Sequence, residues 1–355
     1  MVFAEAECWV RCFAIIKIGM AIAAEHHTGA AEISESRRQM TALVSGCGVY
    51  RLERALFSLT GRDRVRWLNG MVSNNVRDLA AGQGVYAFVL NAQGHIQGDL
   101  YVFHRGESLG LEIERSQVEA LLPVLRRYII MDKVEVEDLS GKTAVIGMAG
   151  PECRRMLEEL GLELPELEAL RFRDAMWRQT PVTVVRGDNP GADNYELWLP
   201  AESLEAAWDA LIETGAVAAE AEALETFRIL CGIPKFGQDI RERTLPQETG
   251  QDRALSFTKG CYIGQEIVER IRARGSVHRR FVGFEVEGAA PPAGTKIQYQ
   301  GKDVGEVSSV TAAALKQKRL ALGFMRREVL EPGRTFTAGE ATVTPVSLPF
   351  TGIFP

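Results

Sequence analysis

Hydrophobic and polar residues alternate in short runs from Val49 onward, and these runs predict a mixture of strands and helices. The run 49–60 alternates as a strand does, and the apolar spacing over 64–71 indicates a helix after a turn. Further strands are predicted over 85–90, 96–103, 143–147, 182–185 and 195–199, and further helices over 117–128, after Pro151 and over 204–212. Because strands and helices alternate without a steady βαβ rhythm, the pattern favours an α+β fold.

The two ends of the chain differ from this middle part. Residues 1–44 contain a polar stretch without a strong period, and they predict a poorly ordered N-terminal extension. After His278 the chain consists of short strands separated by Gly and Pro, which predicts a small antiparallel β-barrel. These strands are expected over 280–287, 296–299, 303–311, 319–325 and 341–348.

Composition removes several classes of protein. The chain has 355 residues, 46% hydrophobic residues and a net charge of −6, which suits a folded multidomain protein and disfavours direct nucleic-acid binding. Six cysteines are too few for a disulfide scaffold of this length, so a cytoplasmic location is expected. No stretch approaches the roughly 18–20 apolar residues that cross a bilayer, and no cysteine or histidine spacing suggests a metal site.

The segment 257–266 carries the densest candidate chemistry. Helical spacing over 265–274 places Cys261 just before a helix N-terminus, and Lys259 lies two residues earlier. In an extended segment the two side chains would point to the same side. The ammonium and the positive end of the helix would then both favour the thiolate of Cys261. The alternative is a small buried cysteine beside a glycine turn.

The eight residues Lys259–Glu266, K-G-C-Y-I-G-Q-E, resemble the signature of the folate-binding YgfZ family, relatives of the glycine cleavage T-protein. Weaker similarity to that superfamily extends from about Val49 and includes 67–78, 90–100 and 228–240. The resemblance implies a three-domain ring around a central channel that holds tetrahydrofolate. It also implies a role in iron–sulfur cluster assembly or repair and in tRNA modification.

The resemblance also implies domain limits. Residues 45–140 together with 215–275 would form the folate-binding α+β region, and 141–214 would form a second α+β domain. Residues 276–355 would form the barrel.

Several site residues follow from the same resemblance. Glu196 resembles the carboxylate that T-proteins use on the pteridine, and a carboxylate can accept two parallel hydrogen bonds from an aminopyrimidine edge. Arg228 resembles the arginine that meets the anionic glutamyl tail of folate. Tyr262 and Gln265 of the motif are assigned to cofactor binding, and Cys261 with Lys259 to catalysis. A strand-edge carboxylate and a helix-surface arginine are the structural alternatives for Glu196 and Arg228.

The segment 90–100 departs from the T-protein pattern G-G-x-x-D-D-L. The first aspartate of that pair falls at Gly98, which leaves Asp99 to bind or position the ligand, or to cap a turn. Aminomethyl transfer would need a carboxylate near the folate amines. The favoured hypothesis is therefore a tetrahydrofolate-binding accessory factor for iron–sulfur proteins, and the alternative is a tetrahydrofolate-dependent aminomethyltransferase.

A basic cluster lies at the end of the predicted helix on this acidic chain. Its members are Arg270, Arg272, Arg274, His278, Arg279 and Arg280. Arginines near a helix C-terminus oppose the macrodipole, which is a structural reason for them. The cluster would also attract polyglutamylated folate or an acidic iron–sulfur client or assembly protein. RNA is the least favoured partner because no aromatic residues are interleaved.

Overall fold

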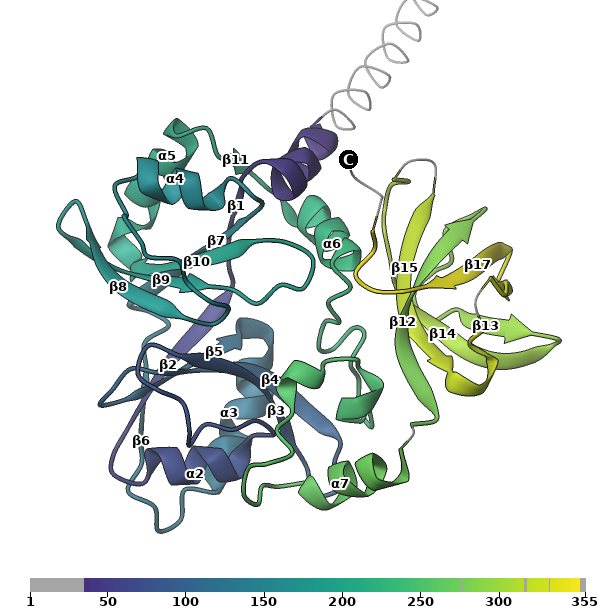
Figure 1. Cartoon of the computed structure of the whole chain (residues 1–355), viewed down its shortest axis with the longest axis horizontal. Coiled ribbons are helices and arrows are strands. Elements are labelled where there is room, and N and C mark those ends of the chain that lie inside the picture. Colours follow the sequence, from purple (N-terminus) through teal and green to yellow (C-terminus); the bar gives the residue numbers. More distant parts are fainter. Residues whose placement is uncertain (1–34, 276, 316–317, 332, 352–355) are drawn as a thin grey trace, which may run out of the picture.

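The computed structural model describes residues 35–275, 277–315, 318–331 and 333–351. Its chain forms two antiparallel-rich sheets that lie one above the other, and a closed barrel beside them (Figure 1). Short 3-10 helices connect several elements: η1 (Arg115–Gln117), η2 (Ala201–Ser203), η3 (Pro246–Glu248), η4 (Asp252–Ala254) and η5 (Arg327–Val329). The predicted α+β fold with a C-terminal barrel is confirmed.

The lower sheet in Figure 1 has five strands and two covering helices. Its order is β3 (Gly84–Leu90), β4 (Ile96–His104), β5 (Leu109–Glu114), β2 (Arg54–Thr60) and β6 (Glu135–Asp138). The helices α2 (Arg64–Met71) and α3 (Val118–Arg127) pack on one face. Alternate residues of the strands, such as Phe57, Leu100 and Leu111, are buried against these helices. The other face is left for contact with the second sheet.

The upper sheet has six strands and is covered in the same way. Its order is β11 (Val217–Ala218), β1 (Gly48–Arg51), β7 (Thr143–Ala149), β10 (Asn194–Pro200), β9 (Thr180–Arg186) and β8 (Phe172–Trp177). The helices α4 (Cys153–Glu159) and α5 (Leu204–Glu213) share its hydrophobic core. β1 pairs with β11 in parallel and with β7 in antiparallel fashion.

The uncovered faces of the two sheets meet. Between them lies an apolar layer that we call the intersheet layer; it consists of Leu56, Phe103, Val145, Phe172, Val185 and Trp198. The Phe103 ring lies 5.0 Å from Trp198 and 5.9 Å from Phe172, both edge to face. These contacts fix the separation of the sheets and leave space on either side of the layer.

The barrel closes through six antiparallel strands. Their order is β12 (Arg279–Glu287), β15 (Arg319–Arg326), β14 (Lys302–Val310), β13 (Lys296–Tyr299), β16 (Phe336–Ala338) and β17 (Ala341–Val346). The helix α6 (Ala221–Leu230) joins barrel and upper sheet through a shared core with residues 35–45, which are also helical. The remaining helix, α7 (Gln265–Arg274), leads into the barrel (Figure 1).

Two sequence predictions need correction. The single strand expected over 49–60 is two strands, because β1 pairs in the upper sheet whereas β2 pairs in the lower one. The expected extension 1–44 lies outside the described residues as far as 34, but 35–44 are helical and bury Met40 and Leu43. Residues 35–44 therefore belong to the folded part of the chain.

Candidate functional site

The motif segment 257–264 packs against the lower sheet. The amide of Ile263 donates to the carbonyl of Gly70 at the end of α2. Gly264 has φ of +85° and is followed directly by α7, and a Cβ at this position would lie 2.6 Å from the Asn91 carbonyl oxygen. Glycine is therefore required here by both the left-handed backbone and the close approach of the β3–β4 turn.

Lys259 is buried and its ammonium group is fully engaged. Its Nζ donates to the carbonyl oxygens of Asn69, Val72 and Asn74 at 2.6, 2.5 and 2.7 Å. Burial and, to a smaller extent, Arg77 lower the pKa of Lys259 to about 7. The three carbonyl acceptors oppose this shift because they favour the charged ammonium.

Cys261 lies on an exposed part of the same segment, four residues before the start of α7. The other described cysteines, Cys47, Cys153 and Cys231, are buried. Lys259 has no N–H left for the Cys261 sulfur, since an ammonium has three donors and the backbone accepts all of them. The reactive thiolate of Cys261 stays a prediction, and any stabilisation of it must come from other groups.

Tyr262 and Gln265 occupy different surroundings. Tyr262 is buried in a hydrophobic cluster that also contains Tyr86, and its hydroxyl has no hydrogen-bond partner among the described residues. Burial raises the pKa of Tyr262 to about 12. Gln265 is the first residue of α7, and its amide donates to the carbonyl of Tyr262. Their assignment to cofactor binding stays a prediction.

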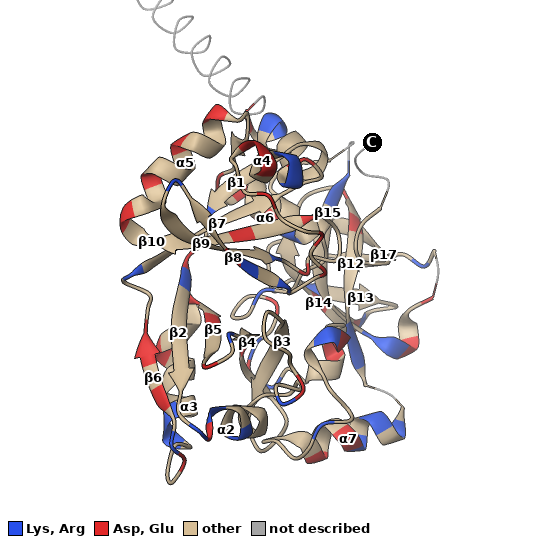
Figure 2. Cartoon of the chain, turned by 60° about the vertical axis from the view of Figure 1, so that its left-hand side comes forward, with Lys and Arg blue, Asp and Glu red and all other residues tan. Residues whose placement is uncertain are grey.

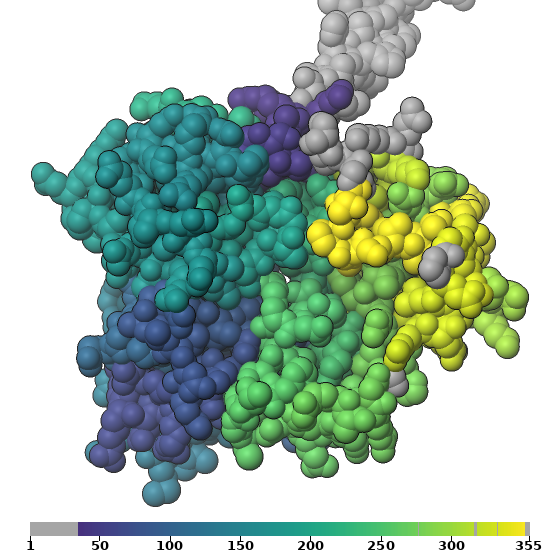
Figure 3. Space-filling model, in the orientation of Figure 1, coloured from purple at the N-terminus to yellow at the C-terminus, as the bar shows by residue number. Residues whose placement is uncertain are grey.

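A group of ionisable side chains lies between the two sheets on one side of the intersheet layer. We call it the central polar cluster; it consists of Tyr50, Arg54, Tyr86, Asp99, Tyr101, Glu112, Asp188, Glu196 and Arg253. Figure 3 shows a narrow opening near the centre of the molecule, where the two sheets and the segment before α7 meet. The cluster thus gathers side chains from both sheets and from two loops in the interior of the protein.

Asp99 belongs to this cluster, whereas Gly98 faces away from it. The Tyr86 hydroxyl and the Gln117 amide donate to the two carboxylate oxygens of Asp99. A Cβ at Gly98 would lie 3.0 Å from both a Leu121 methyl and the Gln117 amide oxygen, on the α3 side of the sheet. Of the two neighbouring positions, 99 is therefore the one that presents a carboxylate to the cluster.

Two carboxyl groups, Glu112 and Glu196, face each other across the cluster. Glu112 is only 2% exposed, and burial together with the charge of Glu196 raises its pKa well above the usual 4.5. Arg54 Nε lies 2.7 Å from Glu112, yet both atoms lack a well-directed hydrogen bond. Trp198 Nε1 donates to Glu196 at 2.9 Å. Burial and the nearby charge of Glu196 therefore both favour the protonated form of Glu112.

The cluster also contains an arginine and two tyrosines, and Tyr101 is the cross-strand neighbour of Glu112. Arg253 forms an ion pair with Asp188, and its guanidinium lies 4.5 Å from the centre of the Tyr86 ring. The Tyr101 hydroxyl donates to Asp188 at 3.1 Å. Burial and Asp188 raise the pKa of Tyr101, so its hydroxyl remains a donor at neutral pH. The cluster thus combines hydrogen-bond acceptors with hydrogen-bond donors.

Sequence reasoning missed most of this cluster. Glu112 stands at a polar position of the alternating run L-G-L-E-I-E, where a half-exposed strand places a solvent-facing residue, so the pattern gave no sign of its burial. Asp188 lies in a loop and Arg253 in the short η4, and neither residue carried a signal.

Arg228 lies outside the cluster, between α6 and the barrel. Its five N–H groups are all donated within the protein, to Glu225, Asp239, Ser309 and the Ile233 carbonyl. Contact with a folate tail stays a prediction, and it would require one of these bonds to be exchanged.

The basic cluster lies on α7 and the start of β12 (Figure 2). Arg272 pairs with Glu269 on its own helix and covers the ring of Phe257 at 5.1 Å. Arg279 pairs with Glu248. These contacts support the structural reading for Arg272 and Arg279.

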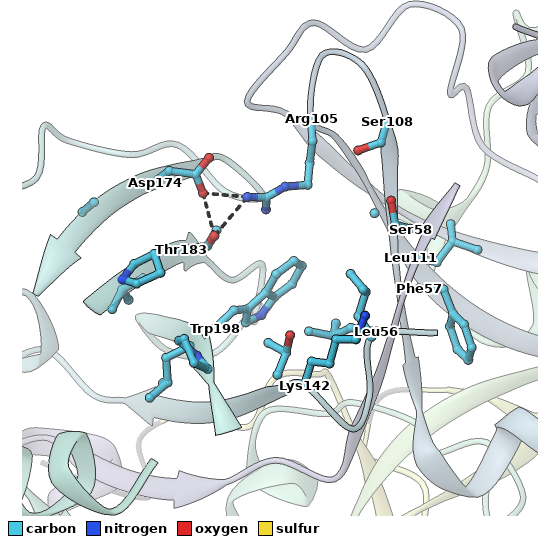
Figure 4. Close-up of a pocket in the computed structure, with 18 residues that line it drawn as sticks. Leu56, Phe57, Ser58, Arg105, Ser108, Leu111, Lys142, Asp174, Thr183 and Trp198 are labelled. Carbon is cyan, nitrogen blue, oxygen red and sulfur yellow. Dashed lines mark hydrogen bonds and ion pairs between the residues drawn. The ribbon is translucent and has the colours of Figure 1, made fainter. Parts of the chain in front are cut away.

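A second cavity of about 390 Å³ lies on the other side of the intersheet layer (Figure 4). Trp198 and Leu56 form part of its wall, and none of the site residues expected from the sequence lines it. Arg105 at its edge donates to Asp174 at 2.7 Å and to Thr183 at 3.1 Å. Arg105 and Asp174 are therefore paired with each other, and Lys142, which also lines the cavity, pairs with Glu137 outside it.

Among the described residues, no helix is long and apolar enough to span a membrane. No group of three or more His, Cys, Asp or Glu side chains there could hold a metal ion.

Comparison with known proteins agrees with this architecture. Residues 26–259 match the family model of the GCVT N-terminal domain, and residues 279–351 match the glycine cleavage T-protein C-terminal barrel domain. The crystal structure of the glycine cleavage system aminomethyltransferase T from Bartonella henselae superposes with a TM-score of 0.80, at 20% identity over 89% of both chains.

Curated relatives match over a similar share of the chain. An aminomethyltransferase of Rippkaea orientalis is 26% identical over 85% of this chain and 84% of its own length. An aminomethyltransferase of Thermus thermophilus is 27% identical over 83% and 84%, and a putative chloroplastic transferase of Arabidopsis thaliana is 24% identical over 79% and 66%. With its sheets, its barrel and these matches, the chain belongs to the glycine cleavage T-protein (GCVT) family.

Proposed function

We propose that this chain binds tetrahydrofolate at the central polar cluster. The observation that carries the proposal is the pair of Glu112 and Glu196 between the sheets, where Glu112 Oε1 and Arg54 Nε are buried without well-directed partners. An aminopyrimidine edge presents parallel N–H groups, and a carboxylate is the group that accepts two of them. Bound tetrahydrofolate would supply a nitrogen that carries a one-carbon unit.

The residues of the cluster have separate tasks in this proposal. Glu196 accepts N–H groups of the pterin. Glu112 is protonated and neutral, so it adds no second buried negative charge beside Glu196. Asp99, oriented by Tyr86 and Gln117, holds a second carboxylate nearby.

The finer proposal is an accessory role in iron–sulfur cluster assembly or repair, in the cytoplasm. Cys261 supports it, because its exposure gives a partner protein access to the thiol. The iron–sulfur client or assembly protein would dock on the surface that carries the motif and α7. Acidic partners suit this surface because Arg270 and Arg274 are both exposed on α7.

The alternative is a tetrahydrofolate-dependent aminomethyltransferase. One specific observation favours it: Asp99 presents a carboxylate to the central polar cluster, which is the group that such a transfer needs. The departure at Gly98 therefore does not remove the carboxylate from the cluster.

Calorimetry with tetrahydrofolate tests the shared part of both proposals. Glu196→Gln should weaken binding about 10-fold or more, because it replaces a charged acceptor by a neutral one. Glu168→Gln is the matched control, since the side chain of Glu168 is 83% exposed and lies outside the cluster, and it should retain the affinity. Absence of binding by the wild-type protein, or equal losses in the two variants, would refute the assignment.

A second experiment separates the two roles. Ammonia- and folate-dependent turnover that survives Cys261→Ser and is lost in Asp99→Asn would establish the transferase. Folate binding without turnover, with iron–sulfur protein maturation lost in Cys261→Ser, would establish the accessory role.

A further inference from the structure

The end of α2 and the segment after it, residues 69–75, are held by one side chain from a distant part of the sequence; we call these residues the loop 69–75. The Nζ of Lys259 reaches the carbonyl oxygens of Asn69, Val72 and Asn74, at 2.5 to 2.7 Å. The side chain is 8% exposed, so water cannot replace the ammonium at these carbonyls without rearrangement. Three backbone acceptors around one ammonium use all of its donors.

The side chains of the same loop pass the restraint on to neighbouring elements. Asn74 Nδ2 donates to the carbonyl oxygens of Tyr86 in β3 and of Arg253 in η4, at 2.8 and 2.7 Å. Ser73 Oγ donates to the Ala254 carbonyl and accepts from the Phe88 amide. The loop therefore ties β3 to η4.

Tyr86 and Arg253 are members of the central polar cluster. The Tyr86 hydroxyl donates to Asp99, and Arg253 pairs with Asp188 while it lies over the Tyr86 ring. A continuous series of hydrogen bonds thus runs from the Lys259 ammonium, through Asn74, to the backbone of two residues that set the geometry of the cluster.

We infer that Lys259 is a positioning residue for the central polar cluster and acts through the backbone of the loop 69–75. It does so by hydrogen bonding, since the three carbonyls need N–H donors as well as a positive charge. This role differs from activation of the Cys261 thiol, which would need the same ammonium elsewhere. The expected effect on ligand binding rests on the proposed folate function, whereas the effect on the loop does not.

Hydrogen exchange of the full-length protein at about pH 6 tests the effect on the loop. In Lys259→Ala the amides of Ser73 and Phe88, which bond across the loop and β3, should exchange about 10-fold faster or more. Lys142→Ala is the matched control because its side chain is 71% exposed, and it should leave both rates unchanged.

Chemical rescue separates hydrogen bonding from simple filling of space. Propylammonium replaces the atoms that Lys259→Ala removes and has three N–H donors, so it should restore slow exchange. Propanol has the same length with one donor and no charge, and it should not restore it. Equal rescue by both compounds, or unchanged exchange in Lys259→Ala, would overturn the inference.

Asn74→Ala provides a second test if Lys259→Ala does not fold. It keeps the Lys259 bonds to the backbone and removes the link to Tyr86 and Arg253. With a wild-type protein that binds tetrahydrofolate, the dissociation constant should rise about 10-fold. An unchanged constant would refute the route through Asn74. A wild-type protein that does not bind tetrahydrofolate would refute the folate proposal. The hydrogen-exchange experiment would then test the restraint of the loop 69–75 independently of folate.

Discussion

Replacing Arg228 by Met should destabilise the protein strongly, because the guanidinium neutralises a carboxylate that water cannot reach. The Asp239 side chain is 0% exposed and lies 2.7 Å from Arg228 Nη1. It also accepts from the hydroxyls of Ser308 and Ser309 and from the Lys235 amide, so it is fixed in its place. Arg228→Met leaves this carboxylate buried without a countercharge.

The magnitude follows from that geometry. Removal of one partner of a buried ion pair typically costs about 3–5 kcal/mol, most of it for the charge that remains. We expect Arg228→Met to have a cost in this range, because Arg228 also joins α6 to the barrel through a hydrogen bond to Ser309 Oγ at 2.8 Å. Arg241→Met is the matched control: Arg241 pairs with Glu306 near the same interface but is 47% exposed, so its loss should cost less than about 1 kcal/mol.

Urea-induced unfolding followed by tryptophan fluorescence measures the difference between the two variants. The free energy of unfolding should fall by about 3–5 kcal/mol in Arg228→Met and hardly change in Arg241→Met. Equal stability of the two variants, together with weaker folate binding in Arg228→Met only, would refute the reasoning. That result would instead support the contact with the folate tail that the family resemblance implies.

Three further predictions concern single side chains. The raised pKa keeps a proton on Glu112 in the folded protein, whereas the unfolded chain releases it above about pH 4.5, so the free energy of unfolding should fall as the pH rises from about 5 to about 8. Urea unfolding over this pH range should show a smaller fall in Glu112→Gln. An unchanged slope in that variant would contradict the raised pKa. Gly98→Asp should lower the free energy of unfolding by about 1–3 kcal/mol in thermal unfolding, because its Cβ would press on Leu121. A variant as stable as the wild type would contradict the close contact between residue 98 and Leu121. Iodoacetamide should modify the exposed Cys261 well before Cys231, which is 2% exposed, and mass spectrometry measures both rates. Equal rates would contradict the exposure of Cys261 in the motif segment 257–264.

Most elements of the fold could be predicted from local patterns, and the errors have physical causes. Helices such as α3 and the strands of the barrel have clear periods, because one face of each is buried and the other is not. The split between β1 and β2 was missed because Leu52 and Glu53 continue the alternation of the strands around them. Only pairing with different sheets separates the two strands, and pairing is a long-range property.

The candidate site was predicted less completely because its contacts join distant parts of the chain. The motif from Lys259 to Glu266 stood out in the sequence, and α7 was placed correctly from it. The acceptors of the Lys259 ammonium are backbone carbonyls of 69–74, about which side-chain identity says almost nothing. Backbone acceptors leave no mark in composition or spacing, so a lysine of this kind is easily taken for a group that acts on a neighbouring side chain.

The two carboxyl groups of the central polar cluster stand at polar positions of alternating strands, so the sequence alone predicts that they are exposed. Glu112 and Glu196 each point to the uncovered face of their sheet, and only the packing of the two sheets covers that face. A buried carboxyl group persists in such a position only with a partner, and here each carboxyl is the partner of the other across the two sheets. Gly147 lies opposite both Tyr50 and Glu196 in the upper sheet, and a Cβ there would lie 2.2 Å from the Tyr50 ring. Glycine at this position therefore leaves room for the Tyr50 ring of the cluster.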